Sequence, residues 1–345
     1  MTEASKQASE ELALIELRGL QKYFPLSDYS SVLPWKKKPV LRAVDSVNLK
    51  IRRGETVGLV GESGCGKSTL GRTLLKLYEP SGGQILFRGE DITFLSEAKM
   101  RPKRRHMQLI FQDPYSSLNP RMTVGEILSE PFFIHGLAKE NPKERVQNLL
   151  HEVGLNPESY SRYPHEFSGG QRQRIGIARS IALSPDLIVC DEPVSALDVS
   201  IQSQILNLLS ELKVKRGLSY LFIAHDLAVV QHISDVIAVM YMGRIVEMAD
   251  RDDLYVHPMH PYTRILIDSI PSESFDQYGH VKKRTISQMI EAPRSQDPEK
   301  SWSEGCQFFP RCPLATDLCR TVRPELKIQG DEHQKYPHSA ACHHI

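Results

Sequence analysis

The sequence predicts an α/β protein with a mixed, mostly parallel β-sheet, and two patterns support this fold class. Short apolar stretches alternate with stretches of helical spacing, which is typical of parallel strands joined by helical crossovers. In addition, a glycine-rich segment and several polar residues come directly after the apolar stretches. Ligands of open α/β sheets bind beyond the carboxyl ends of the strands, so we expect a single active site at that edge.

The first strands are expected ahead of the glycine-rich segment. Residues 12–20 and 40–51 alternate between apolar and polar side chains, which indicates an antiparallel β subdomain at the N-terminal edge. Residues 56–60 are short and apolar, as in a buried strand, and residues 70–77 have helical spacing. Further strands are expected at 84–87, 107–111, 187–192 and 220–224, and helices at 124–135, 142–153, 168–183 and 202–213.

Length and charge exclude several classes of protein. With 345 residues, the chain is long enough for one large or two ordinary domains with an ample core. Its 43 Lys and Arg against 42 Asp and Glu leave no basic field that would indicate nucleic-acid binding. Residues 1–11 are polar and acidic, unlike a signal peptide, and are expected to form a disordered tail. No apolar run approaches a membrane span, so we expect a soluble cytoplasmic protein that can dock on a membrane protein.

The glycine-rich segment, residues 61–69, fits the pattern of a glycine, four residues and Gly-Lys-Ser. Between a strand and a helix, such a loop surrounds a phosphate with backbone N–H groups and a helix N-terminus. Lys67 can then reach the β- and γ-phosphates, and the Ser68 hydroxyl can bind Mg²⁺. The sequence therefore predicts a nucleoside triphosphate site. The nucleotide contacts expected in this segment are Gly61, Ser63, Gly64, Cys65, Gly66, Lys67, Ser68 and Thr69.

Polar residues at other expected strand ends supply the remaining chemistry. Asp191 can hold Mg²⁺ together with Ser68, and the adjacent Glu192 can orient and deprotonate the attacking water. Gln112 can coordinate Mg²⁺ through its amide oxygen and report the nucleotide state to the segment that follows it. A single histidine is more often structural, but His225 is placed where it can contact the γ-phosphate or the water. We therefore expect Glu192, His225 and Gln112 to be catalytic.

A second anion site is expected at Ser168, Gly169, Gly170 and Gln171, because Ser168 is a suitable N-cap and the glycines expose helix-terminal N–H groups. In this order and spacing, the motifs of the chain resemble those of the ATP-binding cassette (ABC) ATPases. The resemblance covers about residues 12–250. It rests on the phosphate loop, Gln112, Ser168 to Gln171, residues 187–192, Ser195-Ala196-Leu197-Asp198 and His225.

The resemblance implies a P-loop NTPase core with an inserted helical subdomain, at about 119–183, and a dimer of two cassettes. ATP would lie between one phosphate loop and the Ser-Gly-Gly-Gln of the partner, so the segment that begins at Ser168 would contact the partner's nucleotide. Asp198 would communicate across the dimer. An aromatic residue near the first strand would stack on adenine, and Phe24 is favoured over Tyr23 for this role.

A finer resemblance is to the ATPase subunits of oligopeptide and dipeptide importers. It rests on residues 111–122, on His260-Pro261-Tyr262-Thr263 and on the cysteines near the end of the chain. Within that family the chain looks like the second of two paralogous ATPase subunits. The resemblance implies an ABC ATPase domain over residues 12–256 and a family-specific, cysteine-containing C-terminal region over residues 257–345.

The same resemblance implies the partners and the location. We expect a paralogous ATPase subunit, two transmembrane permease subunits and an extracytoplasmic peptide-binding protein, with this chain peripheral on the cytoplasmic face of the inner or plasma membrane. Relatives with almost identical ATPases carry nickel, glutathione or other small solutes, so these cargoes are the alternatives. A role on nucleic acid or the ribosome is a distant alternative, since the chain has a single cassette, no heptads and no net basic charge.

Four cysteines gather near the C-terminus: Cys306, Cys312, Cys319 and Cys342. Four thiolates suffice for an iron–sulfur cluster, and resemblance to relatives favours a [4Fe–4S] cluster as a third cofactor beside ATP and Mg²⁺. The spacing lacks the close cysteine pairs of common structural zinc sites, although His338, His343 and His344 could join one. Uncoordinated thiols are the remaining alternative.

Overall fold

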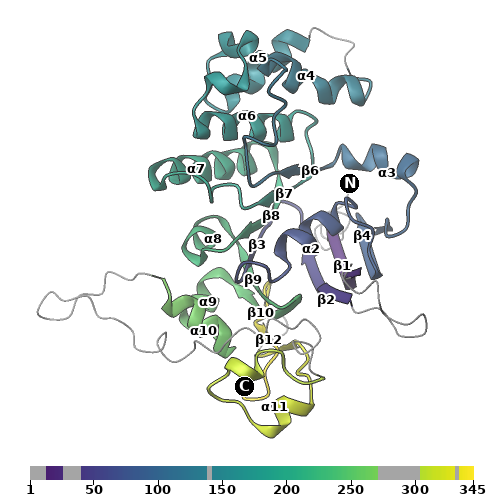
Figure 1. The fold of residues 1–345 in the computed structure, drawn as a ribbon, viewed down its shortest axis with the longest axis vertical. Helices are drawn as coiled ribbons and strands as arrows, with labels where there is room; N and C mark the ends of the chain where they lie inside the picture. Colours follow the sequence, from purple (N-terminus) through teal and green to yellow (C-terminus); the bar gives the residue numbers. More distant parts are fainter. Residues whose placement is uncertain (1–12, 26–39, 138–141, 271–303, 331–333) are drawn as a thin grey trace, which may run out of the picture.

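A central eight-stranded sheet organises the fold (Figure 1). The computed structural model describes residues 13–25, 40–137, 142–270, 304–330 and 334–345, so the tail expected at 1–11 lies outside the described residues. The strand order is β11-β12-β10-β9-β3-β8-β7-β6, and β9, β3, β8, β7 and β6 run parallel. The strands are β3 (Thr56–Val60), β6 (Met107–Ile110), β7 (Leu187–Asp191), β8 (Ser219–Ala224), β9 (Val236–Tyr241), β10 (Arg244–Asp250), β11 (Lys327–Ile328) and β12 (Ser339–Ala340).

A second, antiparallel sheet with the order β2-β1-β4-β5 lies beside the central one (Figure 1). Its strands are β1 (Ile15–Pro25), β2 (Val40–Ile51), β4 (Gly82–Phe87) and β5 (Glu90–Asp91). The first strand extends further than the expected 12–20, because Tyr23 and Phe24 continue the ladder by pairing with Arg42 and Leu41 of β2. The antiparallel subdomain that the sequence predicts is therefore present.

Helices cover the central sheet and also form a separate group at one end of the molecule. In Figure 1 the helices α4, α5 and α6 gather beyond α7, at the end opposite the C-terminal residues. The helices are α2 (Lys67–Leu74), α3 (Glu97–Arg104), α4 (Val124–Ile134), α5 (Pro142–Glu152), α6 (Gly169–Ile181), α7 (Val199–Arg216), α8 (Leu227–Ile233), α9 (Arg251–Val256), α10 (Pro261–Asp268) and α11 (Asp317–Thr321). The α/β fold class with an antiparallel subdomain and an additional helical part is confirmed.

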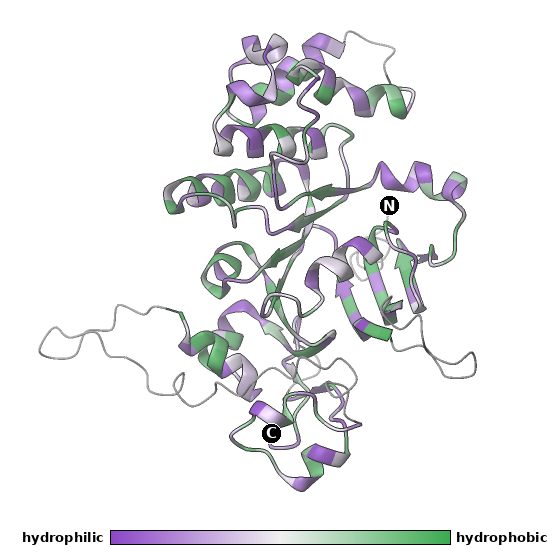
Figure 2. Ribbon diagram, viewed as in Figure 1, coloured by the Kyte–Doolittle hydropathy of each residue, from purple (hydrophilic) through white to green (hydrophobic). Residues whose placement is uncertain are grey.

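Two apolar cores lie on opposite faces of the central sheet, and the strands between them are mostly hydrophobic (Figure 2). Along β3, Val57 and Leu59 face the core shared with α2 and the antiparallel sheet, whereas Val60 faces the core shared with α6 and α7. Every residue of β3, β7 and β8 is buried. This double burial fixes the register of the strands whose carboxyl ends carry the polar residues.

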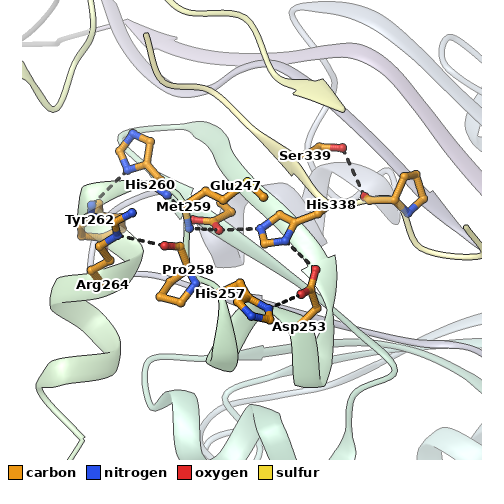
Figure 3. Close-up of polar contacts among 11 residues, drawn as sticks. Glu247, Asp253, His257, Pro258, Met259, His260, Tyr262, Arg264, His338 and Ser339 are labelled. Carbon is orange, nitrogen blue, oxygen red and sulfur yellow. Dashed lines mark hydrogen bonds and ion pairs between the residues drawn. The ribbon is translucent and has the colours of Figure 1, made fainter. Parts of the chain in front are cut away.

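Short strands and a buried histidine attach the C-terminal residues to the rest of the chain. Strand β12 pairs with β10, where Ala340 lies opposite Glu247. His338, only 3% exposed, places Nε2 2.8 Å from Glu247 Oε1 and Nδ1 2.7 Å from Asp253 Oδ2 (Figure 3). The fully buried Glu247 also accepts the N–H groups of Met259 and His260. Burial alone would lower the pKa of His338, but the two carboxylates outweigh it and raise the pKa.

We expect replacement of His338 by Gln to reduce stability in a pH-dependent way. Because the pKa of His338 is raised in the folded state, its contribution is fully present below the unfolded pKa of about 6.5 and is lost as the pH rises through the folded value. The free energy of unfolding should therefore fall by about 3 kcal/mol at pH 6 and by less at pH 9. Urea unfolding at both pH values measures this difference, with the exposed His151→Gln as the matched control. A deficit that grows with pH would contradict the assignment.

Candidate active site

The phosphate loop connects β3 to α2 and is confined by backbone on two sides. A Cβ atom on Gly66 would lie 2.0 Å from the carbonyl oxygen of Ala43, and one on Gly61 would lie 2.1 Å from that of Met240. Gly66 is also the N-cap of α2 and has a φ of 111°, which favours glycine. These two positions therefore require glycine, and the loop is held at the carboxyl end of β3.

Lys67 lies inside the loop with only 4% of its surface exposed. Its ammonium donates hydrogen bonds to the carbonyl oxygens of Gly61 (2.7 Å) and Glu62 (3.0 Å), and Nζ lies 3.9 Å from Cys65 Sγ. Burial raises the pKa of the Cys65 thiol, so this side chain stays neutral beside the ammonium. The charge of Lys67 is thus enclosed by the loop that the sequence assigns to phosphate binding.

Ser68, in the first turn of α2, is in contact with Asp191, the last residue of β7. The Ser68 hydroxyl donates a hydrogen bond of 2.6 Å to Asp191 Oδ1, and Arg72 Nη2 lies 3.3 Å from Asp191 Oδ2. Asp191 is 1% exposed, so its charge needs these partners. Arg72 is not among the residues predicted from the sequence, although it lies one helical turn after Ser68 and therefore on the same face of α2.

Glu192 forms the centre of a second polar group, one residue beyond β7. Gln112 Nε2 donates to Glu192 Oε2 over 2.9 Å, and His225 Nδ1 lies 3.5 Å from the same oxygen. The backbone of Glu192 has a φ of 49°, a conformation that is costly for a residue with a side chain. The strand ends β6, β7 and β8 therefore bring together the three residues that the sequence predicts to be catalytic.

The Ser-Gly-Gly-Gln segment begins α6 and is well formed. The Gln171 N–H donates to Ser168 Oγ (3.3 Å) and the Ser168 N–H donates to Gln171 Oε1 (3.0 Å), a reciprocal capping box. Both side chains are exposed. The glycines instead pack toward α7, since a Cβ on Gly170 would lie 2.6 Å from Ile201 Cγ2. The Ser168 carbonyl also accepts the N–H of Arg172 over 2.9 Å, so the hydrogen bonds described for Ser168 all lie within the first turn of α6.

The two candidates for adenine stacking differ in their surroundings. The Tyr23 hydroxyl donates to Asp45 Oδ1 over 2.7 Å, and burial together with this carboxylate raises the pKa of Tyr23 to about 12. Phe24 lies edge-on to Tyr78 with 5.6 Å between the ring centroids, and Lys22 Nζ is 4.7 Å from its centroid. Tyr23 is thus engaged through its hydroxyl, whereas Phe24 is partly exposed and has no polar atom to satisfy.

The prediction of a [4Fe–4S] cluster was wrong. Among the residues that the structure describes, no group of three or more His, Cys, Asp or Glu side chains is arranged to hold a metal ion, which also removes the zinc alternative. The Cys319 Sγ instead lies 3.4 Å from Thr316 Oγ1 and 3.4 Å from His344 Nε2. Burial raises the pKa of the thiols of Cys306, Cys312 and Cys342. All four cysteines of this region are free thiols.

Two family models match separate parts of the chain. One, described as ABC transporter, matches residues 44–195, and the other, described as Oligopeptide/dipeptide transporter, C-terminal region, matches residues 246–319. Over 338 residues, the chain is 48% identical to the oligopeptide transport ATP-binding protein AppF of Bacillus subtilis (strain 168), a match that covers 97% of this chain and 98% of the relative. It is also 50% identical over 328 residues to a putative peptide import ATP-binding protein of Brucella ovis, over 94% and 97% of the two chains.

Solved structures share the same fold. The ATP-binding cassette MJ0796, in a dimeric post-hydrolysis state bound to ADP and Pi, superposes with a TM-score of 0.60 at 25% identity, over 69% of this chain and 98% of that one. CbiO1 from Clostridium perfringens, part of the transporter complex cbiONQ, gives a TM-score of 0.59 at 26% identity, over 72% and 92%. Within the described ranges, none of the helices combines the length and hydrophobicity that crossing a bilayer requires.

The strained backbone of Glu192 leads to a stability prediction. Glycine adopts a φ of 49° without strain, so Glu192→Gly should be more stable than Glu192→Ala by about 1 kcal/mol. Both variants lose the contacts of the Glu192 side chain with Gln112 and His225, which makes Glu192→Ala the matched control. Chemical denaturation of the two purified variants measures the difference. Equal stability of the two would show that the surrounding structure does not store this strain.

Proposed function

The chain belongs to the ATP-binding proteins of ABC transporters, in the oligopeptide/dipeptide transporter family, and from this premise we propose that it hydrolyses ATP to drive peptide import. One observation supports the hydrolytic role above others. Two adjacent residues at the end of β7 make contacts with different groups. Asp191 accepts a hydrogen bond from Ser68 of the phosphate loop, and Glu192 contacts Gln112 and His225. A metal site and a water site can therefore lie side by side next to the triphosphate.

The proposed reaction is the attack of water on the γ-phosphorus of ATP. The water oxygen forms a bond to phosphorus, the bond from phosphorus to the β–γ bridging oxygen breaks, and ADP and phosphate are released. Glu192 orients the water and takes its proton, while Gln112 and His225 hold the Glu192 carboxylate in place. Lys67 moves from the loop carbonyls toward the β- and γ-phosphates.

The residues present fit a magnesium ion. The Ser68 hydroxyl and the buried carboxylate of Asp191 lie 2.6 Å apart, and oxygen ligands of this kind suit Mg²⁺. We assign Ser68, Asp191 and the amide oxygen of Gln112 to the ion. When bound, Mg²⁺ supplies positive charge that neutralises the phosphate oxygens. Arg72 holds the second oxygen of Asp191 and so orients this carboxylate.

In this proposal, one chain supplies half of the contacts to each ATP, and a partner cassette supplies the other half. The loop residues Gly61 and Ser63 to Thr69 bind the phosphates, and Phe24 stacks on adenine in preference to Tyr23. Ser168 and Gln171 are exposed at the start of α6, where a second cassette can approach. The solved cassette MJ0796 is dimeric. We therefore propose that Ser168 to Gln171 contact the nucleotide of a partner cassette, with Asp198 at the interface.

The names of the relatives support the proposed transport partners. The relatives are named as oligopeptide transport and peptide import ATP-binding proteins, which supports two permease subunits, a peptide-binding protein and a paralogous ATPase as partners, with this chain on the cytoplasmic face of the membrane. The segment after Gln112 offers a docking surface for the permease. Tyr115 in this segment and Phe111 directly before Gln112 are exposed, and their rings lie beneath the guanidinium groups of Arg172 and Arg179, respectively.

The base assignment predicts the behaviour of Glu192→Gln. Without the carboxylate, ATP turnover should fall by a factor of about 10² to 10⁴, whereas binding of MgATP should persist because the phosphate loop is unchanged. Phosphate release and equilibrium binding of ATP to the same preparation measure the two quantities. The exposed Glu211→Gln on α7 is the matched control and should behave as the wild type. Normal turnover in Glu192→Gln would remove the residue from catalysis.

The cargo assignment predicts which solute stimulates the ATPase. In proteoliposomes that contain the chain, its partner ATPase and two permeases, a peptide-loaded binding protein should raise ATP turnover severalfold. Nickel or glutathione added in place of peptide should leave the rate at its basal level. Phosphate release and uptake of labelled solute are measured together. Stimulation by nickel or glutathione alone would assign the chain to that cargo instead.

A further inference from the structure

The C-terminal region, here residues 304–330 and 334–345, touches the phosphate loop directly. Arg311 Nη2 lies 2.8 Å from Glu62 Oε1, and Arg311 Nη1 lies 3.0 Å from Glu62 Oε2. This bidentate pair joins residues that are 249 positions apart in the chain, and both side chains are largely buried. Paired guanidinium and carboxylate groups fix each other's orientation as well as their distance. Glu62 is the second residue of the loop, directly after Gly61.

Glu62 is held through its backbone as well as its side chain. Its N–H donates a hydrogen bond of 2.8 Å to the Tyr262 hydroxyl, and its carbonyl oxygen accepts one of 3.0 Å from Lys67 Nζ. A continuous chain of contacts therefore runs from Arg311 through Glu62 to Lys67, the cation assigned to the phosphates. Tyr262 stands in the His-Pro-Tyr-Thr segment at the start of α10, so two segments that follow β10 in sequence reach the loop.

Arg311 is itself confined by a packed aromatic cluster. Its guanidinium carbon lies 5.8 Å from the ring centroid of Tyr241 and 5.7 Å from that of Phe308. Phe308 is 1% exposed and packs against Tyr241, Tyr262 and His260. The hydrogen bonds to Glu62 raise the pKa of Arg311, so the group remains charged. The guanidinium is thus a rigid group that loses little conformational freedom when it holds the loop.

The alternative role of Arg311 is to attach the C-terminal region to the cassette. Other contacts already do this: β12 pairs with β10, and the buried His338 bridges Glu247 and Asp253 (Figure 3). These contacts are made to residues of α9 and β10 and not to the phosphate loop. A bidentate pair to a phosphate-loop carboxylate is therefore not needed for attachment, and it acts on the one segment whose conformation decides phosphate binding.

We propose that the C-terminal region is part of the nucleotide site, with Arg311 as a positioning residue that fixes Glu62 and, through it, the loop carbonyls and Lys67. This inference rests on the proposed binding of a triphosphate at the loop. Loss of the pair leaves the loop with more conformations to lose on binding, so nucleotide affinity falls while the residues that perform hydrolysis stay in place.

The test compares Arg311→Ala, Glu62→Gln and the double variant with the wild type, in the full-length chain. Binding of MgATP is measured with a fluorescent ATP analogue, and KM and kcat are measured by phosphate release. We expect each single variant to bind MgATP roughly tenfold more weakly and to raise KM, with kcat changed less than about twofold. The double variant should be no weaker than either single one, because both remove the same contact. Arg311→Lys should restore part of the affinity.

The control is Arg320→Ala, which removes an exposed arginine from the same region and should leave affinity unchanged. Wild-type affinity in Arg311→Ala, or additive losses in the double variant, would overturn the proposal. If Arg311→Ala does not fold, Glu62→Gln alone decides, since it keeps the arginine and nearly the same side-chain shape. A wild-type chain that binds no MgATP would instead overturn the proposed function, so the two failures are distinguishable.

Discussion

The confinement of the phosphate loop between two backbones is the constraint on which the rest of the structure depends. Gly66 packs against the carbonyl of Ala43 in β2, and Gly61 packs against that of Met240 in β9. The loop therefore touches both sheets at once, and a side chain at either glycine would push them apart. Because β2 and β9 are distant in sequence, the loop reaches its shape only when the antiparallel sheet has docked on the central one. The position of Lys67 is thus a property of the whole fold.

Two energetically unfavourable features lie at the end of β7, and the surrounding core stabilises both. Asp191 is a buried charge, and Glu192 has a strained backbone, a conformation that costs on the order of 1–3 kcal/mol. Strand β7 is buried at every residue and lies between β6 and β8, so its end cannot relax without disturbing both apolar cores. The Glu192 N–H also donates to the carbonyl of Ile223 in β8. The sheet therefore holds two carboxylates in orientations that neither would adopt in a free loop.

The sequence predicts the strand-end residues well because geometry leaves little choice. Parallel strands end at one edge of a sheet, so Gln112, Glu192 and His225 had to converge once their strands were recognised. The contact between Arg311 and Glu62 has no such local signal, since its partners are separated by 249 residues and brought together by aromatic packing. For the four C-terminal cysteines, by contrast, the sequence predicts a metal site that the described residues do not form. Their clustering in sequence indicates proximity, but coordination depends on the direction of each Sγ, which the spacing does not encode.

The proposed hydrolytic residue and the segment assigned to the partner's nucleotide are mechanically linked within one chain. The Ser195 N–H donates to the carbonyl of Glu192, and the turn continues to Leu197, against which Gly169 packs. The turn also contains the buried Val194, so a displacement of Glu192 would be passed to the turn and through Leu197 to the start of α6. In the proposed dimer, this link of about five residues would connect the hydrolytic residue of each chain to the segment that we assign to the partner's nucleotide.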